Sequence, residues 1–268
     1  MIENRHYFFK KKYTILLFMK SITLPSCPNS PIQHDQKQAE GYFQLKLFGS
    51  FNFLYNDMFE EKVINYDQNY QNEQGHSEHF QNHLIEVYEL IKKNNFQRNS
   101  RLVEVGCGKG KFLEIVKSDD FFIYEGYDNA YEGNDKQIFK RFLTEKDRVS
   151  ADIVVLRHTL EHIKSPYSFL KSLHTIFGSD AVIFIEVPQF EWIKQNKVIY
   201  DFTYEHVNYF TTASLCSLFS KVIDCGNFFE GQYQYCMAKL GDLFNKEWEN
   251  FENADKTSFD IQEYYDQF

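Results

Sequence analysis

The 268-residue chain contains few of the residues that interrupt regular structure, with only 5 Pro and 12 Gly. Disordered and low-complexity segments are enriched in these residues, so their scarcity argues against a largely disordered chain. Hydrophobic residues make up 43% of the chain and aromatic residues 18%, including 28 Phe and 18 Tyr. This composition can fill a sizeable core, and the length fits one α/β unit with additions.

Cys-x-x-Cys pairs, long hydrophobic runs and long basic stripes are also missing from the sequence. Five scattered cysteines fit a reducing cytoplasm. The apolar run at residues 13–19 ends at Lys20, far below the roughly 18 residues of a membrane span, and no signal-peptide cleavage site follows it. The net charge is −9, and the only basic run is residues 10–12. We therefore expect a cytoplasmic protein without a membrane or nucleic-acid partner, and the sequence leaves open a monomer or a homodimer.

Hydrophobic periodicity predicts an α/β fold from residue 101 onward. Strands and helices alternate up to about residue 222, which is typical of a mostly parallel sheet with helices on both faces. An antiparallel pair at 222–229 and 233–240 is expected to close this sheet. The predicted elements are a hairpin at 42–59, strands at 101–105, 121–128, 151–158 and 181–188, and helices at 77–94, 111–118, 134–143, 165–177 and 211–222.

This pattern divides the chain into three parts. Residues 1–75 form an N-terminal extension with a small β-hairpin, residues 76–240 a central domain, and residues 241–268 a helical tail. The helix at 77–94 carries His79 and His83, which share a face with His76. With no acidic or Cys partner in clear spacing, this face is expected to be solvated.

The stretch RLVEVGCGKGKFLEIV (101–116) places Gly106, Gly108 and Gly110 between a predicted strand and a predicted helix. A P-loop needs Gly-Lys-[Ser/Thr] five residues after a Gly, which is missing here. The dinucleotide fingerprint needs a third glycine where Lys111 stands. A turn that needs positive φ alone is the structural alternative, although one glycine normally suffices for it.

The remaining pattern, Glu-x-Gly-x-Gly-x-Gly, resembles motif I of the class I S-adenosylmethionine (SAM) methyltransferases. The resemblance implies a Rossmann-like, seven-stranded fold that binds SAM and releases S-adenosylhomocysteine. The cofactor-binding residues that it implies in this motif are Glu104, Gly106, Cys107, Gly108 and Gly110.

Asp128 follows the second strand, 24 positions after Glu104. A carboxylate at this place can accept hydrogen bonds from ribose hydroxyls, as an acidic residue does in dinucleotide folds. A helix cap is the alternative role for Asp128. Its neighbours Tyr127 and Asn129 are expected to line the cofactor groove.

The segment 151–173 resembles motif IV of the same superfamily, which implies that Arg157 and His158 lie beside the methionine end of the cofactor. His158, Glu161 and His162 also form the His-x-x-Glu-His pattern of some zinc hydrolases. That chemistry requires both histidines on one helix, whereas His158 follows a strand and Pro166 starts the next helix. A zinc hydrolase is therefore a remote alternative, and His162 remains a candidate catalytic residue.

The segment "EVP" at 186–188, followed by "YEHVNYFTTASL" at 204–215, resembles sugar C-methyltransferases and related enzymes of surface-polysaccharide synthesis. That resemblance implies that Glu205 and His206 lie over the acceptor, with His206 as general base. Thr203 stands where the group has a Tyr, so the adjacent Tyr204 is the candidate for that role. Carbon methylation beside a ketone requires loss of an α-proton, and an imidazole with an ordinary pKa of about 6.5 suits this step. Oxygen methylation also needs a base, so His206 does not decide the methylated atom.

The same group begins with a four-Cys zinc module, which is degenerate in this sequence. Cys27 remains, but Ser30 stands where the second Cys would be, and a structural zinc ion needs four ligands. We therefore expect no zinc and no metal ligands. Tyr66 and Tyr70 are expected to close over the acceptor as substrate-binding residues.

The leading hypothesis is a SAM-dependent methyltransferase acting on a small molecule, a sugar or glycan precursor. The alternative from another functional class is a SAM-binding scaffold or regulator without catalysis, because the front and rear modules of the sugar-modifying group are degenerate or missing.

Overall fold

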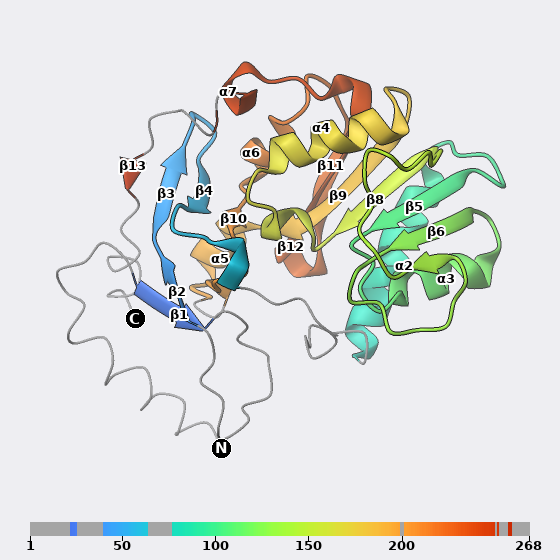
Figure 1. Cartoon of the computed structure of the whole chain (residues 1–268), viewed down its shortest axis with the longest axis horizontal. Coiled ribbons are helices and arrows are strands. Elements are labelled where there is room, and N and C mark those ends of the chain that lie inside the picture. The colour runs from blue at the N-terminus through green and yellow to red at the C-terminus, as the bar shows by residue number, and fades with distance from the viewer. Residues whose placement is uncertain are drawn as a thin grey trace.

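The central element of the fold is a seven-stranded sheet in the order β11-β12-β9-β8-β5-β6-β7 (Figure 1). The computed structural model describes residues 22–25, 40–63, 77–198, 201–249, 251 and 257–258. Strands β5 to β9 of this sheet run parallel, whereas β12 pairs antiparallel with β9 and β11. The predicted Rossmann-like fold with a closing antiparallel hairpin is confirmed. The strands are β5 Arg101–Val105, β6 Ile123–Tyr127, β7 Ile138–Phe139, β8 Ile153–Arg157, β9 Val182–Pro188, β11 Val222–Phe228 and β12 Tyr233–Lys239.

Helices cover both faces of this sheet (Figure 1). Apolar residues of α2 (Glu78–Lys93) and α3 (Lys111–Asp119) form one core cluster with inward-facing residues of β5, β8, β9 and β12. Apolar residues of α4 (Pro166–Phe177) and α6 (Thr212–Cys216) form another cluster with the opposite faces of the same strands. No helix in the described parts of the chain is long and apolar enough to cross a membrane.

A second sheet has the order β10-β4-β3-β13 and joins distant parts of the sequence. The predicted N-terminal hairpin is present as β3 (Leu45–Phe48) and β4 (Phe53–Asn56). Strand β10 (Asn208–Tyr209) pairs with β4, and β13 (Thr257–Ser258) pairs with β3. The hairpin is thus held between a segment that follows the main sheet's β9 and a segment near the C-terminus. A further pair is formed by β1 (Ile22–Pro25) and β2 (Glu40–Phe43).

Aromatic side chains fasten the C-terminal segment to this hairpin. Trp248 is 2% exposed, lies 5.3 Å from the Phe51 ring in a stacked arrangement and donates a hydrogen bond to Ser217 Oγ. Phe251 packs edge-on against Phe48 at 4.9 Å. Of the predicted helical tail, the described residues contain the four-residue helix α7 (Lys246–Glu249) and strand β13.

Two further predictions of helices need correction. The segment 134–143 contains β7 and turns instead of a helix, because its backbone pairs with β6 and Phe139 stacks on Tyr127 at 5.0 Å. The helix predicted at 211–222 is only α6, which begins with a capping box formed by Thr211 and Ser214. The other short helices among the described residues are η2 Glu61–Val63, η3 Leu160–His162, α5 Phe190–Gln195, η5 Phe229–Gly231 and η6 Leu240–Asp242.

Candidate functional site

The glycine loop lies at the carboxyl edge of the sheet, between β5 and α3. Gly106, Gly108 and Gly110 all adopt positive φ, at 76°, 54° and 81°. A Cβ atom at Gly106 would collide with the Thr159 side chain, and one at Gly110 would lie 2.7 Å from Ile138 Cδ1. A Cβ atom at Gly108 would meet no atom within 4 Å among the described residues. All three glycines therefore meet a conformational requirement, and open space lies beside the backbone of the middle one.

Asp128 faces this loop from the end of β6. Its Oδ2 accepts a hydrogen bond of 2.7 Å from the backbone nitrogen of Gly108, and its Oδ1 accepts one of 2.7 Å from Ala130. Carboxylate oxygens have about four lone-pair sites in total, so both oxygens retain capacity to accept from a ligand hydroxyl. The predicted juxtaposition of the carboxylate and the glycine loop is therefore present.

Three other residues were predicted to bind the cofactor, and the structure places two of them in the core and one at the surface. Tyr127 is 3% exposed and donates to Glu125, so its ring belongs to the core and does not line a groove. Cys107 is also buried, in the cluster under α3, and burial raises the pKa of its thiol. Asn129 is exposed beside Asp128.

A buried ionic group lies directly behind the glycine loop. Arg157, at the end of β8, donates from Nε to Glu186 Oε2 at 2.8 Å, and its Nη1 lies 4.0 Å from Glu104 Oε1. Burial, opposed only in part by Arg157, raises the pKa of Glu104 to about 8. Glu104 Oε2 and Arg157 Nη2 are buried without a hydrogen-bond partner among the described residues. A carboxyl oxygen and a guanidinium nitrogen thus lie enclosed behind the loop without partners among the described residues.

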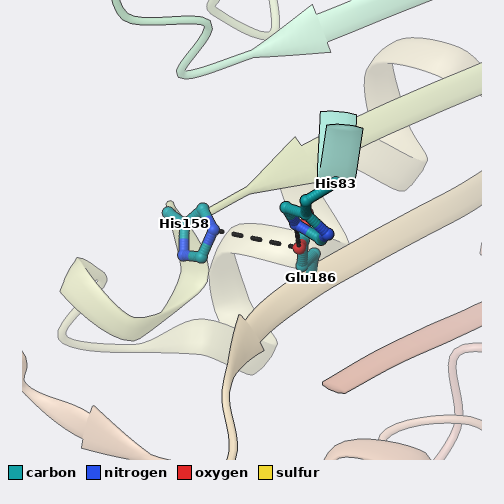
Figure 2. Close-up of side chains that lie close together, drawn as sticks. All are labelled: His83, His158 and Glu186. Atoms are coloured by element: carbon teal, nitrogen blue, oxygen red, sulfur yellow. Dashed lines mark hydrogen bonds and ion pairs between the residues drawn. The ribbon is translucent and has the colours of Figure 1, made fainter. Parts of the chain in front are cut away.

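Figure 2 shows His83 and His158 close to the Glu186 carboxylate. His83 Nε2 bonds to Glu186 Oε1 at 2.5 Å, and His158 Nε2 lies 3.9 Å from the same oxygen. Burial favours the neutral form of Glu186, but Arg157 and the two histidines outweigh it and lower the pKa of this carboxyl to about 2. The prediction of a solvated face is wrong for His83, which is 2% exposed.

His158 leaves β8 in the left-handed region, with φ of 48°, and turns toward η3. The Nδ1 atom of His158 lies 3.5 Å from Glu161 Oε1. Because the chain turns between His158 and η3, the His-x-x-Glu-His pattern does not lie on one helix, as the hydrolase motif requires.

The segment 205–208 is fastened to η3, which brings His206 beside His162. The Asn208 side chain donates to the carbonyls of Leu160 and Ile163, at 3.0 and 2.6 Å. The two imidazole rings lie 5.1 Å apart in an edge-on arrangement. A ring nitrogen of each, together with a carboxylate oxygen of Glu161, lies in a group of atoms all within 4.8 Å of one another.

The protonation of this group is set by burial and by backbone carbonyls. His162 Nδ1 bonds to the carbonyl of Glu205 at 2.8 Å, and His206 Nδ1 bonds to the carbonyl of Asp201 at 3.2 Å. Burial lowers the pKa of both histidines, opposed in part by the Glu161 carboxylate. Burial also favours neutral Glu161, but the three surrounding histidines outweigh it and lower the pKa of this carboxyl.

Glu205 and Tyr204 contribute to this region through structure. Glu205 is 3% exposed, and its backbone carbonyl, rather than its carboxylate, holds His162. Tyr204 is completely buried, and its hydroxyl accepts a hydrogen bond of 2.8 Å from the backbone nitrogen of Glu60. The structure therefore places Tyr204 in the cluster under the N-terminal hairpin rather than beside His206. Tyr66 and Tyr70 lie outside the described residues.

Sequence reasoning missed His83 and Glu186 as parts of this site. Glu186 is a lone charged residue inside the apolar strand β9, and a buried charge of this kind signals a partner. His83 shares the stripe of Phe80, Leu84 and Val87 on α2, so its helical position already indicated burial.

Residues 77–222, more than half of the chain, match the model of a family described as a methyltransferase domain. No curated protein sequence matches the chain. A SAM-dependent methyltransferase structure from Archaeoglobus fulgidus is 16% identical, with 58% of this chain and 92% of that chain covered and a TM-score of 0.45. One from Thermotoga maritima is 14% identical, with 60% and 90% covered and a TM-score of 0.44. At these values neither likeness indicates a substrate.

Proposed function

The chain belongs to the methyltransferase-domain family, and we propose that it transfers a methyl group from SAM to a sugar or glycan precursor, with His206 as general base. The observation that carries the proposal is the pairing of Asp128 with Gly108 beside open space. In this proposal residues 76–240 form the methyltransferase domain, residues 1–75 an N-terminal extension and residues 241–268 a C-terminal tail. The described cysteines form no disulfide, which suits the expected cytoplasmic location.

The residues around the glycine loop match the polar groups of SAM. Asp128 would accept hydrogen bonds from the ribose hydroxyls, and the backbone at Gly108 would lie against the cofactor. The unpartnered Glu104 oxygen would receive the ammonium of the methionine part, and the unpartnered Arg157 nitrogen its carboxylate. When bound, SAM supplies an electrophilic methyl group on a sulfonium.

The arrangement of His206 supports its role as the base. Its Nδ1 donates to the Asp201 carbonyl, so the neutral ring carries its lone pair on Nε2. Burial keeps this ring neutral and thus able to accept a proton from the acceptor. The base would serve a carbon acid beside a ketone or a hydroxyl group equally, so the proposal covers carbon and oxygen methylation.

The choice of a sugar or glycan acceptor rests on the resemblance of residues 186–215 to sugar C-methyltransferases. The structural alternative for residues 205–206 is a helix-entry turn in which the His206 side chain only satisfies nearby backbone groups, as polar side chains commonly do. The placement of His206 next to His162 and Glu161, rather than against backbone alone, favours the catalytic role.

Calorimetric titration with SAM and S-adenosylhomocysteine tests the cofactor part of the proposal. Asp128→Ala should weaken binding by about 1.5–3 kcal/mol, or roughly 10- to 150-fold in Kd, because it removes charge-assisted hydrogen bonds. Asp180→Ala is the matched control, since the Asp180 side chain is fully exposed. Absence of binding to the wild-type protein at high micromolar SAM would end the proposal.

Transfer from methyl-labelled SAM to a panel of nucleotide-linked keto-sugars tests the activity. We expect labelled product from the wild-type protein and a loss of at least 100-fold in His206→Ala, as is usual for removal of a general base. Cofactor binding without transfer to any acceptor would favour the SAM-binding scaffold instead.

A further inference from the structure

We propose that Glu161, His162 and His206 form a binding site for one divalent transition-metal ion. Two imidazoles and one carboxylate are a ligand set that proteins use for zinc and for non-haem iron, with further coordination positions left open. The ligand atoms of these three residues already lie within 4.8 Å of one another.

The hydrogen bonds of the two histidines prepare them as ligands. Each Nδ1 donates to a backbone carbonyl, of Glu205 for His162 and of Asp201 for His206. The lone pair of each neutral ring is therefore on Nε2, and His162 Nε2 lies 4.0 Å from Glu161 Oε1. Metal-binding histidines almost always donate their other ring nitrogen to a carbonyl or carboxylate, which fixes the ring in this way.

The Glu161 carboxylate is buried, and the ionisable groups beside it are the imidazoles of His158 and His162. It is 1% exposed, and neither oxygen has a hydrogen-bond partner or a lysine or arginine ion pair within the described part of the chain. A buried carboxylate that faces imidazoles and no lysine or arginine would gain further stabilisation from a bound cation. His158, at 3.5 Å, is its nearest ionisable neighbour.

The spacing of the ligand atoms fits a transition-metal ion after a small closure. Bonds of about 2.1 Å to a tetrahedral ion place neighbouring ligand atoms about 3.4 Å apart. The 4.0 Å between His162 Nε2 and Glu161 Oε1 is longer than this distance, and a rotation of either side chain would close the difference. The other candidate cluster, His83, His158 and Glu186, suits an ion less well, because Glu186 already accepts from Arg157 and from His83.

This site was not expected from the sequence, which predicted no metal ligands. His206 lies 44 positions after His162, and the His-x-x-Glu-His pattern drew attention to His158 as the second histidine. A bound ion would use the lone pair of His206 that the proposed general base needs. The base therefore belongs to the metal-free protein, and metal binding requires neither SAM nor an acceptor.

Titration of the full chain with Co²⁺ tests the site. The protein is first freed of metal with a chelator, and Co²⁺ binding is followed by visible absorption and then by competition with Zn²⁺. We expect one Co²⁺ per chain, displaced by Zn²⁺. Glu161→Gln and His206→Gln should weaken Co²⁺ binding at least tenfold, whereas His83→Gln and His174→Gln should bind as the wild type does.

A wild-type protein that binds neither ion at high micromolar concentration would overturn the proposal, as would unchanged binding by Glu161→Gln and His206→Gln. His206→Cys decides the matter if those variants do not fold. A sulfur ligand adds a charge-transfer band in the near ultraviolet, so Co²⁺ binding to this variant without the band also overturns the site. None of these outcomes depends on methyl transfer, so failure of the metal site leaves the proposed function standing.

Discussion

The backbone nitrogen of Gly108 donates to the Asp128 carboxylate across 2.7 Å, which ties the glycine loop to the end of the neighbouring strand β6. Gly108 is also the loop glycine beside which the described residues leave open space. At Gly108 the requirement for a left-handed backbone and the requirement for open space can therefore be tested separately. The carboxylate fixes the loop, and the space beside the loop is where a cofactor would lie.

Gly108→Ala should weaken SAM binding by more than its effect on stability explains. The left-handed φ of 54° costs an alanine about 1–2 kcal/mol, and the new methyl group would occupy the open space. Gly178→Ala is a matched control, because Gly178 also has positive φ and open space but lies at the end of α4. Thermal unfolding and calorimetry on both variants check the prediction. Equal SAM affinity in the two variants would show that the cofactor does not lie beside Gly108.

Local signals explain why much of the fold could be predicted from the sequence. Ser165 and Pro166 mark the start of α4, and the hydrophobic stripe of α2 sets its bounds within one residue. The helix predicted at 134–143 was wrong because the apolar spacing of this segment suits a helix, whereas pairing with β6 determines its structure. Such pairing depends on residues that the segment itself does not contain.

The site was predictable where one segment carries it and not where distant segments meet. The glycine loop and Asp128 follow directly from strand ends. His83 and Glu186 are 103 positions apart, and their hydrogen bond crosses from α2 to β9. Tyr204 was a candidate because it adjoins Thr203, where the sugar-modifying group has a Tyr, but the chain bends at residues 204–205 and does not continue as a strand to His206. The Tyr204 ring lies in the hairpin cluster, against Phe59 at 5.4 Å.

Tyr204→Phe should consequently lower stability without lowering methyl transfer. The hydroxyl accepts from the Glu60 backbone nitrogen, and loss of one such bond costs about 0.5–1.5 kcal/mol. Tyr42→Phe serves as control, since Tyr42 is 59% exposed. Denaturant unfolding gives the stability difference, and the labelled-SAM assay gives the rate. A loss of tenfold or more in the rate of methyl transfer with unchanged stability would show that Tyr204 is a catalytic residue.

SAM binding should release a proton from Glu104 at pH 7. Because burial raises the pKa of this carboxyl to about 8, it is mainly protonated at pH 7, and pairing with the ammonium of SAM would require its ionised form. Affinity should therefore rise as the pH rises from 7 to about 8, and fall above that as the α-ammonium of SAM loses its own proton. Calorimetry in two buffers of different ionisation enthalpy measures the released proton, and Glu104→Gln should release none. Identical binding enthalpies in both buffers would contradict the proposed contact.

The raised pKa of Glu104 also determines how the free energy of unfolding changes with pH. Between about pH 4.5 and pH 8 the folded protein holds a proton on Glu104 that the unfolded chain gives up. The free energy of unfolding should therefore fall as the pH rises through this interval, and the pH dependence should be weaker in Glu104→Gln.

Trp248→Ala should detach the C-terminal segment from the N-terminal hairpin. The indole is 2% exposed, packs 4.7 Å from Phe53 and donates to Ser217 Oγ. Truncating a buried Trp to Ala costs about 3–5 kcal/mol, which is a large part of the stability of a domain. Phe244→Ala is the control, because Phe244 is 56% exposed in the same segment.

Thermal unfolding and limited proteolysis measure this effect. We expect Trp248→Ala to lower the Tm by several degrees and to expose cleavage sites after residue 240, while Phe244→Ala stays within about 0.5 kcal/mol of the wild type. Because Phe53 and Phe210 both pack around Trp248, and Phe210 precedes α6, loosening the tail should also loosen the contact between the hairpin and the main sheet. A Trp248→Ala protein as stable and protease-resistant as Phe244→Ala would show that the aromatic cluster is not what joins the two sheets.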